Sequence, residues 1–170
     1  MLFNIDDKVV HPVYGVGHIV QIEARKFSEK GERQYYKVTL SRSTLWIPVD
    51  KAQATIGLRL VTAKQDLEQY RTLLQSQPVP FNTHKPQLWH LELTTRLKQG
   101  TFSTMCEVVR DLTALDWRRP LGATNKALLR KTQEKLCQEW ATAADISLAE
   151  AAREIETLLQ SSSGSGTQVK

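Results

Sequence analysis

The sequence is poor in cysteine and has no long hydrophobic run. Its two cysteines, Cys106 and Cys137, are far apart and form no C-x-x-C pair. This usage does not fit a disulfide framework, and we expect two reduced, buried thiols. No segment approaches the length of a membrane span, and no apolar run follows a basic patch at the N-terminus, as a secretory signal would require. These absences favour a globular protein of the cytoplasm, not associated with a membrane.

Motifs of the common enzyme classes are also missing. The sequence contains no G-x-S-x-G, Walker A, G-x-G-x-x-G or H-E-x-x-H pattern. Its four histidines lack the spacing of a metal site on one helix or strand. The carboxylates are scattered among lysines and arginines, as on solvated helix faces. We therefore predict a protein that is not an enzyme and uses no cofactor or metal, with a hidden acid/base pair as a third-ranked alternative.

What the chain does contain is an ordinary globular composition with a basic excess. Of its 170 residues, 41% are hydrophobic and 24% are charged, and the formal net charge is +5. This length can bury a core as one domain or as two small ones. The basic charge permits an acidic partner such as nucleic acid, although an ordinary basic surface would give the same value.

The first fifty or so residues have the pattern of β-strands. Short apolar or β-branched runs at residues 9–10, 19–27, 34–40 and 44–47 are separated by turn residues. Pro48 ends the last run because proline cannot donate to a β-ladder. The spacing predicts a small barrel or sandwich whose thin core needs support from the following helices.

After Gly57 the pattern becomes helical, and one proline-rich stretch interrupts it. Three prolines within residues 78–86 exclude a regular helix and favour a stiff, extended backbone. Residues 161–170 are rich in serine and glycine and are predicted to be disordered. The expected units are a sheet domain at 1–58, a connecting helix and linker at 59–86, a helical domain at 87–160, and the tail.

Local signals predict where the helices begin and end. Thr62 and Ser147 each open a capping-box pattern, in which a hydroxyl and a Gln or Glu side chain satisfy amides of the first turn. Gly100 is expected to end a helix over residues 87–98. After a break at residues 121–122, Thr124 or Asn125 is expected to cap the longest helix. The last helix is expected to turn inward Leu148, Ala151, Ala152, Ile155, Leu158 and Leu159.

The most specific string is D-K-V-V-H-P-V-Y-G-V-G at residues 7–17. Pro12 interrupts the ladder, and Gly15 and Gly17 permit a tight turn or close approach. The string resembles the first hairpin of the CarD family and of the RNA-polymerase-interacting domain of transcription-repair coupling factors. Further matches to that hairpin's domain are Phe3, Ile22, Tyr35, Tyr36, Ile47 and Pro48.

A second string, E-V-V-R-D-L at residues 107–112, resembles a signature of the CarD helical domain, together with Leu97 and Gly100. Coupling factors share only the first string and continue into a helicase, which 170 residues do not hold. The resemblance implies an α+β fold, with a small Tudor-like β-barrel followed by an all-α helical bundle. It also implies that the barrel binds the β subunit of bacterial RNA polymerase and that the bundle contacts promoter DNA at the upstream edge of the bubble.

Three residues match positions of the polymerase contact. Arg25 and Phe27 fall where the family's second strand touches polymerase, and Trp46 lies where family members often carry a basic residue. Docking would be strand addition or packing at a sheet edge. Arg25 is expected to be exposed. An exposed Trp46 would be an interface anchor, whereas in the alternative interpretation Trp46 and Phe27 fill the barrel core.

The DNA-contacting part departs from the family. CarD proteins present a tryptophan wedge at the start of the second domain, followed by two arginines that hold phosphate. Ungapped matching on Gly100 and residues 107–112 puts Pro86 at the wedge position, with Leu88 and Trp89 at the arginine positions. The wedge is therefore either displaced to Trp89, beside Lys85 and His90, or lost. In the second case Trp89 packs in an apolar stripe with Leu93 and Leu97, which is the interpretation that we favour.

A second basic group lies in the longest predicted helix, at Lys126, Arg130 and Lys131. With Lys135, these residues could follow a phosphate backbone, although Glu134 interrupts the run and a solvated helix face is the more common explanation. We predict a CarD-like regulator that binds RNA polymerase and favours the open promoter complex by mass action. The alternatives are a polymerase-binding adaptor without the wedge, and a DNA-binding protein independent of polymerase.

Overall fold

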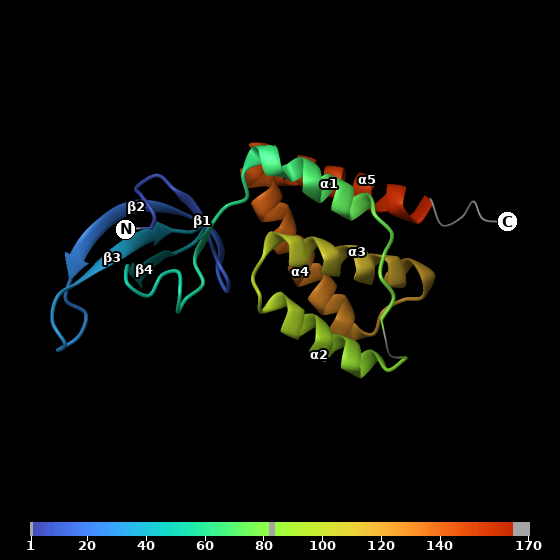
Figure 1. The fold of residues 1–170 in the computed structure, drawn as a ribbon, viewed down its shortest axis with the longest axis horizontal. Helices are drawn as coiled ribbons and strands as arrows, with labels where there is room; N and C mark the ends of the chain where they lie inside the picture. Colours follow the sequence, from blue (N-terminus) through green and yellow to red (C-terminus); the bar gives the residue numbers. More distant parts are fainter. Residues whose placement is uncertain (1, 82–83, 165–170) are drawn as a thin grey trace. The chain divides into compact units, whose positions relative to one another are not determined.

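The computed structural model describes residues 2–81 and 84–164 and divides the chain into two compact units, Met1–Val61 and Thr62–Lys170. The first unit holds the strands and the second holds the helices (Figure 1). This arrangement confirms the α+β prediction. Among the described residues, no helix is both long and apolar enough to cross a membrane.

Five antiparallel strands form one sheet in the order β4-β3-β2-β1-β5. Strand β5 was not predicted, because two residues give no period; it pairs with β1 at the edge of the sheet opposite β4. The strands are β1 (Lys8–His11), β2 (Gly15–Arg25), β3 (Arg33–Thr39), β4 (Thr44–Pro48) and β5 (Arg59–Leu60).

The geometry of the hairpin between β1 and β2 accounts for the glycines and the histidine in its sequence. Gly15 has a φ of 81°, in the left-handed region that favours glycine. Gly17 is needed for a close approach, because a Cβ there would lie 2.6 Å from Val38 Cγ1. The His11 Nδ1 atom accepts hydrogen bonds from the amides of Val13 (3.0 Å) and Tyr14 (3.2 Å). These contacts hold the turn that Pro12 begins.

A β-bulge decides which residues of β2 point outward. Ile19 lies opposite Val38, but Gln21 lies opposite Lys37, so one extra residue is inserted between them. Because side chains alternate along a strand, the insertion exchanges the two faces of the sheet beyond that point. Ile22 therefore packs toward the core, and Arg25 lies on the outward face. The buried core of the unit comprises Phe3, Val9, Ile19, Tyr36, Val38, Ile47, Ala52 and Leu58.

The helical unit packs its helices around one core. Helices α1 and α5 lie side by side, α3 packs on α4, and α2 contacts both α3 and α4 (Figure 1). Helix α1 buries Leu67 and Leu74 in this core, so the helix expected to connect the domains is part of the helical unit. The elements are η1 (Lys64–Asp66), α1 (Leu67–Gln75), α2 (Pro86–Leu97), α3 (Phe102–Arg118), α4 (Ala123–Ala144) and α5 (Leu148–Gly164).

Two of the predicted helix ends are confirmed. The Ser147 hydroxyl accepts a hydrogen bond from the Glu150 amide (3.1 Å), and the Glu150 carboxylate accepts one from the Ser147 amide (3.0 Å). This is the reciprocal capping box. Gly100 follows α2 with a φ of 69° and donates its amide to the Leu97 carbonyl at 3.0 Å.

Two other predicted caps are wrong because buried groups compete for them. Thr62 does not cap a helix; its amide and hydroxyl both donate to Glu139 Oε1, at 3.1 and 2.9 Å. Glu139 is only 1% exposed, so its carboxylate needs such donors. Helix α4 begins at Ala123, and Asn125 is buried in its first turn, where the side-chain amide donates to the Pro86 carbonyl (3.3 Å).

The division between the two units falls between two consecutive residues, and each of them is hydrogen-bonded within its own unit. The amide of Val61 donates to the Lys8 carbonyl of the sheet unit at 3.0 Å. The next residue, Thr62, is bound to Glu139 of the helical unit. The expected boundary at residue 58 thus lies three residues before the observed division, because β5 and Val61 extend the sheet unit.

The last helix is longer than predicted and differs at two inward positions. Helix α5 continues to Gly164, so residues 161–164 are helical rather than disordered; residues 165–170 of the expected tail lie outside the described residues. The Ser161 and Ser162 hydroxyls donate to carbonyls of the preceding turn, which suits serine to a helix end. Leu148 and Ala152, which were predicted to point inward, are exposed.

Candidate functional site

Five side chains from the β2–β3–β4 part of the sheet gather on its outward face. The Arg25 guanidinium carbon lies 4.0 Å from the centroid of the Trp46 ring, and the Lys37 ammonium lies 5.5 Å from it. Phe27 meets Tyr35 edge to face, with 4.9 Å between ring centroids. We call Arg25, Phe27, Tyr35, Lys37 and Trp46 the aromatic–basic cluster. The three predicted polymerase-binding residues thus lie together.

The register of the sheet excludes the core interpretation of Trp46 and Phe27. Ile47 is buried and lies opposite Tyr36, so the neighbouring Trp46 projects to the other face, opposite Lys37. Trp46 is half-buried among its cluster neighbours, and Phe27 is 55% exposed. Neither residue belongs to the core of the sheet unit. Both rings are available at the surface.

Arg25 is oriented by a neighbouring carboxylate. Its guanidinium pairs with Glu23, two residues earlier on the same face of β2, and Gln21 donates to the same carboxylate. A cation above an exposed aromatic ring contributes about 0.5–1 kcal/mol. These contacts hold the Arg25 side chain against Trp46. A side chain that is already ordered loses less entropy when a partner binds.

Strand β4 leaves one backbone edge open beside this cluster. The Leu40 amide donates to Ser43 (2.8 Å) and the Val49 amide to Gln34 (3.0 Å). By antiparallel alternation the amides and carbonyls of Thr44 and Trp46 point away from β3. Within the described part of the chain no strand pairs with this side of β4. The edge can therefore accept an extended segment from another protein.

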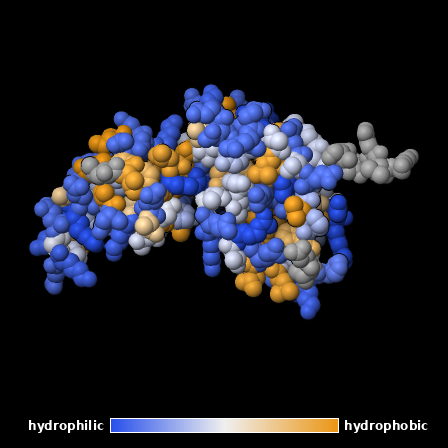
Figure 2. Space-filling view, in the orientation of Figure 1, coloured by the Kyte–Doolittle hydropathy of each residue, from blue (hydrophilic) through white to orange (hydrophobic). Residues whose placement is uncertain are grey.

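Trp89 lies on the inner side of α2 rather than on its outer face. It is half-buried, packs against the helical core and stacks on Phe81, with 5.1 Å between centroids and 26° between planes. On the outer face of α2, Leu88 and Leu91 are exposed. Figure 2 shows this hydrophobic surface over α2, at the lower edge of the helical unit.

The predicted basic residues lie near one end of the helical unit. Lys85 precedes α2, and Lys126, Arg130 and Lys131 are exposed along the first half of α4. The hydrogen bond from Asn125 to Pro86 joins the starts of these two helices. The three α4 residues line a shallow groove of about 350 Å³, where Glu134 adds one negative charge. Burial, with repulsion from Lys131, lowers the pKa of nearby Lys135.

His90 differs from the lysines in its surroundings. Its side chain is half-buried, and its Nδ1 atom is buried with no hydrogen-bond partner among the described residues. The ring therefore turns one nitrogen into the protein. Lys85, by contrast, is exposed.

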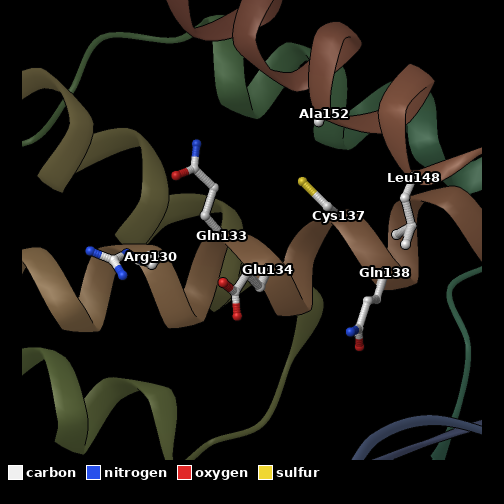
Figure 3. Close-up of a pocket in the computed structure, with 7 residues that line it drawn as sticks. All are labelled: Arg130, Gln133, Glu134, Cys137, Gln138, Leu148 and Ala152. Atoms are coloured by element: carbon white, nitrogen blue, oxygen red, sulfur yellow. The ribbon is translucent and has the colours of Figure 1, made fainter. Parts of the chain in front are cut away.

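A second groove, also of about 350 Å³, lies between α4 and α5 (Figure 3). The Cys137 sulfur points from α4 toward α5, and Leu148 and Ala152 line the opposite wall. Cys137 is half-buried rather than buried, and burial raises the pKa of its thiol. Burial also raises the pKa of Cys106, which is fully buried. Both thiols are therefore poor nucleophiles.

Sequence reasoning assigned no role to Arg110 and Asp111, although both lie in the E-V-V-R-D-L string. These charged residues are 6% and 2% exposed, and Arg110 Nε donates to Asp111 Oδ1 at 2.9 Å. Glu107 pairs with Arg96 of α2 at 3.0 Å. The signal in the sequence was the position of these charges between Val109 and Leu112, in an otherwise apolar stripe.

The fold and the exposed cluster define a two-unit protein with a Tudor-like sheet domain and a helical second domain. Residues 3–61 match the family described as CarD-like/TRCF RID domain, and residues 72–156 match the family described as CarD, C-terminal domain. "Putative transcription factor YdeB" of Bacillus subtilis (strain 168) is 30% identical over 140 residues, covering 81% of this chain and 90% of that relative. The chain belongs to the CarD-like family of transcription factors.

Proposed function

We propose that this protein is a transcription regulator of the bacterial cytoplasm that binds RNA polymerase through the sheet unit. The observation that carries the proposal is the Arg25–Trp46 contact, 4.0 Å from guanidinium to ring, beside the open edge of β4. Backbone groups of this edge would pair with a strand of polymerase, and the aromatic–basic cluster would supply specificity. The β subunit is the proposed partner because the first domain resembles the polymerase-interacting domains of its family.

The helical unit is proposed to lie against upstream promoter DNA and to favour the open complex. Lys126, Arg130 and Lys131 are exposed along one helix and have the charge to follow a phosphate backbone. Trp89 packs on the helical core and on Phe81, so the proposed apolar contact is the part of its ring that stays accessible, displaced from the family's wedge position. Because regulator binding to the open state is stronger than to the closed state, the equilibrium moves toward the open state.

The polymerase contact is tested by titrating core RNA polymerase with the full-length chain, without DNA. Arg25→Glu reverses a cluster charge and is expected to weaken binding by about tenfold or more. Lys8→Glu makes the same charge change at an exposed side chain of β1 and serves as the matched control. Equal affinities of the two variants would refute the assignment of Arg25.

The DNA contact is tested by the lifetime of the open promoter complex. Trp89→Ala is expected to shorten the regulator-dependent lifetime while binding to polymerase is kept. An unchanged lifetime with retained helicity would favour the alternative of a polymerase adaptor without a wedge. DNA affinity that is steeply salt-dependent and independent of polymerase would favour the other alternative, a DNA-binding protein acting alone.

A further inference from the structure

Charged residues of α3 hold three other segments of the helical unit. Arg110 and Asp111 pair inside the unit, and Glu107 lies one turn earlier on the same helix. A buried ion pair is weak evidence for stability, because its desolvation offsets most of the attraction. The contacts that the pair makes with other segments therefore indicate its role.

Arg110 fixes the end of α1. Its Nη1 donates to the Ser76 hydroxyl at 2.7 Å and to the Leu73 carbonyl at 3.5 Å. The Leu73 carbonyl also accepts the Ser76 amide and the Ser76 hydroxyl, so Arg110 adds a charged donor to a helix end that Ser76 already closes. These contacts join α3 to the point where the chain leaves α1.

Asp111 fixes the proline-rich segment that follows. Its Oδ1 accepts the Val79 amide at 3.0 Å. Val79 lies between Pro78 and Pro80, and because proline has no N–H, Val79 carries the single backbone donor of this tripeptide. Prolines also stiffen the backbone, so holding Val79 restrains Phe81, which is two residues away and stacks on Trp89.

Glu107 of α3 holds α2 through an ion pair with Arg96. Arg96 Nη2 lies 3.0 Å from Glu107 Oε2, and Arg96 Nη1 lies 4.0 Å from Asp111 Oδ2. Arg96 follows Trp89 by two helical turns. A groove of about 330 Å³ lies beside these contacts, lined by Pro80, Phe81, Arg96 and Asp111, so apolar packing does not fill the space between the segments.

We propose that Glu107, Arg110 and Asp111 form a positioning network that sets the Phe81–Trp89 pair. The proposal rests on the proposed function for the DNA contact of Trp89, but the positioning itself does not depend on DNA. The charged residues of the E-V-V-R-D-L string then position the Phe81–Trp89 pair indirectly, by holding the proline-rich segment and α2. None of its three charged residues needs to touch DNA.

The positioning is tested by NMR on the full-length chain without DNA. In Asp111→Ala the Val79 amide loses its charged acceptor and is expected to exchange with solvent about tenfold faster or more. The Trp89 indole resonance is expected to shift, and its NOEs to Phe81 to weaken. Ile155→Val, a core change on α5, is the control and should leave both signals in place. Wild-type Trp89 signals in a folded Asp111→Ala variant would overturn the proposal.

A second variant covers the case in which Asp111→Ala does not fold. Val79→Pro removes the donor from an exposed linker residue and leaves α3 intact. It is expected to shift the same Trp89 and Phe81 signals while helicity is retained. Unchanged signals in this variant would likewise overturn the proposal.

The link to promoters is tested by a double-mutant cycle on open-complex lifetime. If Asp111 acts through Trp89, the double variant should shorten the open-complex lifetime no more than Trp89→Ala alone does. Additive losses would overturn the action through Trp89. If Trp89→Ala alone has no effect on lifetime, the proposed DNA contact fails, and the NMR result still decides whether the network positions the aromatic pair.

Discussion

The two units use charged side chains in opposite ways. In the sheet unit, Arg25 and Lys37 lie on an outward face beside Trp46, whose ring they approach from solvent. In the helical unit, Arg110 and Asp111 are buried and bind the backbone or side chains of segments more than thirty residues away in sequence. Charge in the first unit lies at the surface, and charge in the second is bonded inside the protein.

This difference predicts different effects of substituting charged residues in the two units. An exposed charge remains hydrated when its neighbour is removed, so substitution affects binding more than folding. A buried charge that loses its counterpart has no water to replace it, so substitution affects folding first. Measured stabilities and affinities of matched variants should therefore separate the two units.

The largest effect on stability is expected for Arg110→Ala. It leaves Asp111 buried without its cation and should lower the free energy of unfolding of the helical unit by about 3–5 kcal/mol. Urea denaturation followed by the helical signal in circular dichroism measures this loss. A loss below about 1 kcal/mol, the usual value for a surface pair, would remove the contrast between the units.

The next largest effect is expected in the core of the sheet unit. Gly17→Ala adds a Cβ at 2.6 Å from Val38 Cγ1 and should destabilise the unit by about 1–3 kcal/mol through overpacking. Gly122→Ala is a matched control, since nothing lies within 4 Å of its added Cβ. Amide exchange of β1 and β2 residues reports the loss, and equal exchange in both variants would contradict it.

A smaller effect is expected at the start of α5. Ser147→Ala removes the hydroxyl that accepts the Glu150 amide and should cost about 1 kcal/mol in thermal or urea unfolding. Glu150→Gln keeps an oxygen for the reciprocal bond and should cost less. A neutral Ser147→Ala variant would show that tertiary packing alone fixes this helix end.

The smallest effect on stability is expected for Arg25→Ala. The residue is exposed, so the free energy of unfolding should change by no more than about 0.5 kcal/mol. Titration of RNA polymerase should nevertheless show weaker binding. A destabilisation comparable with that of Arg110→Ala would show that the two units treat charge alike.

Much of the fold could be predicted from local patterns. Four strands, the helical period and the Ser147 capping box follow from residues close together in sequence. The outward position of Arg25 depends on the bulge between Ile19 and Gln21, and no local residue pattern predicts that extra residue. The candidate polymerase residues were found by resemblance, and the register of β4 then excluded the core interpretation of Trp46.

The two wrong helix caps came from partners that are distant in the sequence. Thr62 has a normal capping pattern, but Glu139 is 77 residues away and takes both of its donors. Asn125 likewise serves the Pro86 carbonyl, 39 residues away. A single sequence gives the residue types of such pairs but not which pairs form, so the Arg110–Asp111 network was also missed.

The direct passage from Val61 to Thr62 has a consequence for affinity. Because the two units are joined at consecutive residues, binding of one unit keeps the other tethered to the same complex by a short covalent link. Short tethers give effective concentrations of about millimolar, so the second contact becomes an intramolecular event. On the proposed function, a DNA affinity too weak to measure in isolation would suffice at a promoter that polymerase has already occupied. On that proposal, a modest basic surface would act selectively, with promoter choice left to the polymerase.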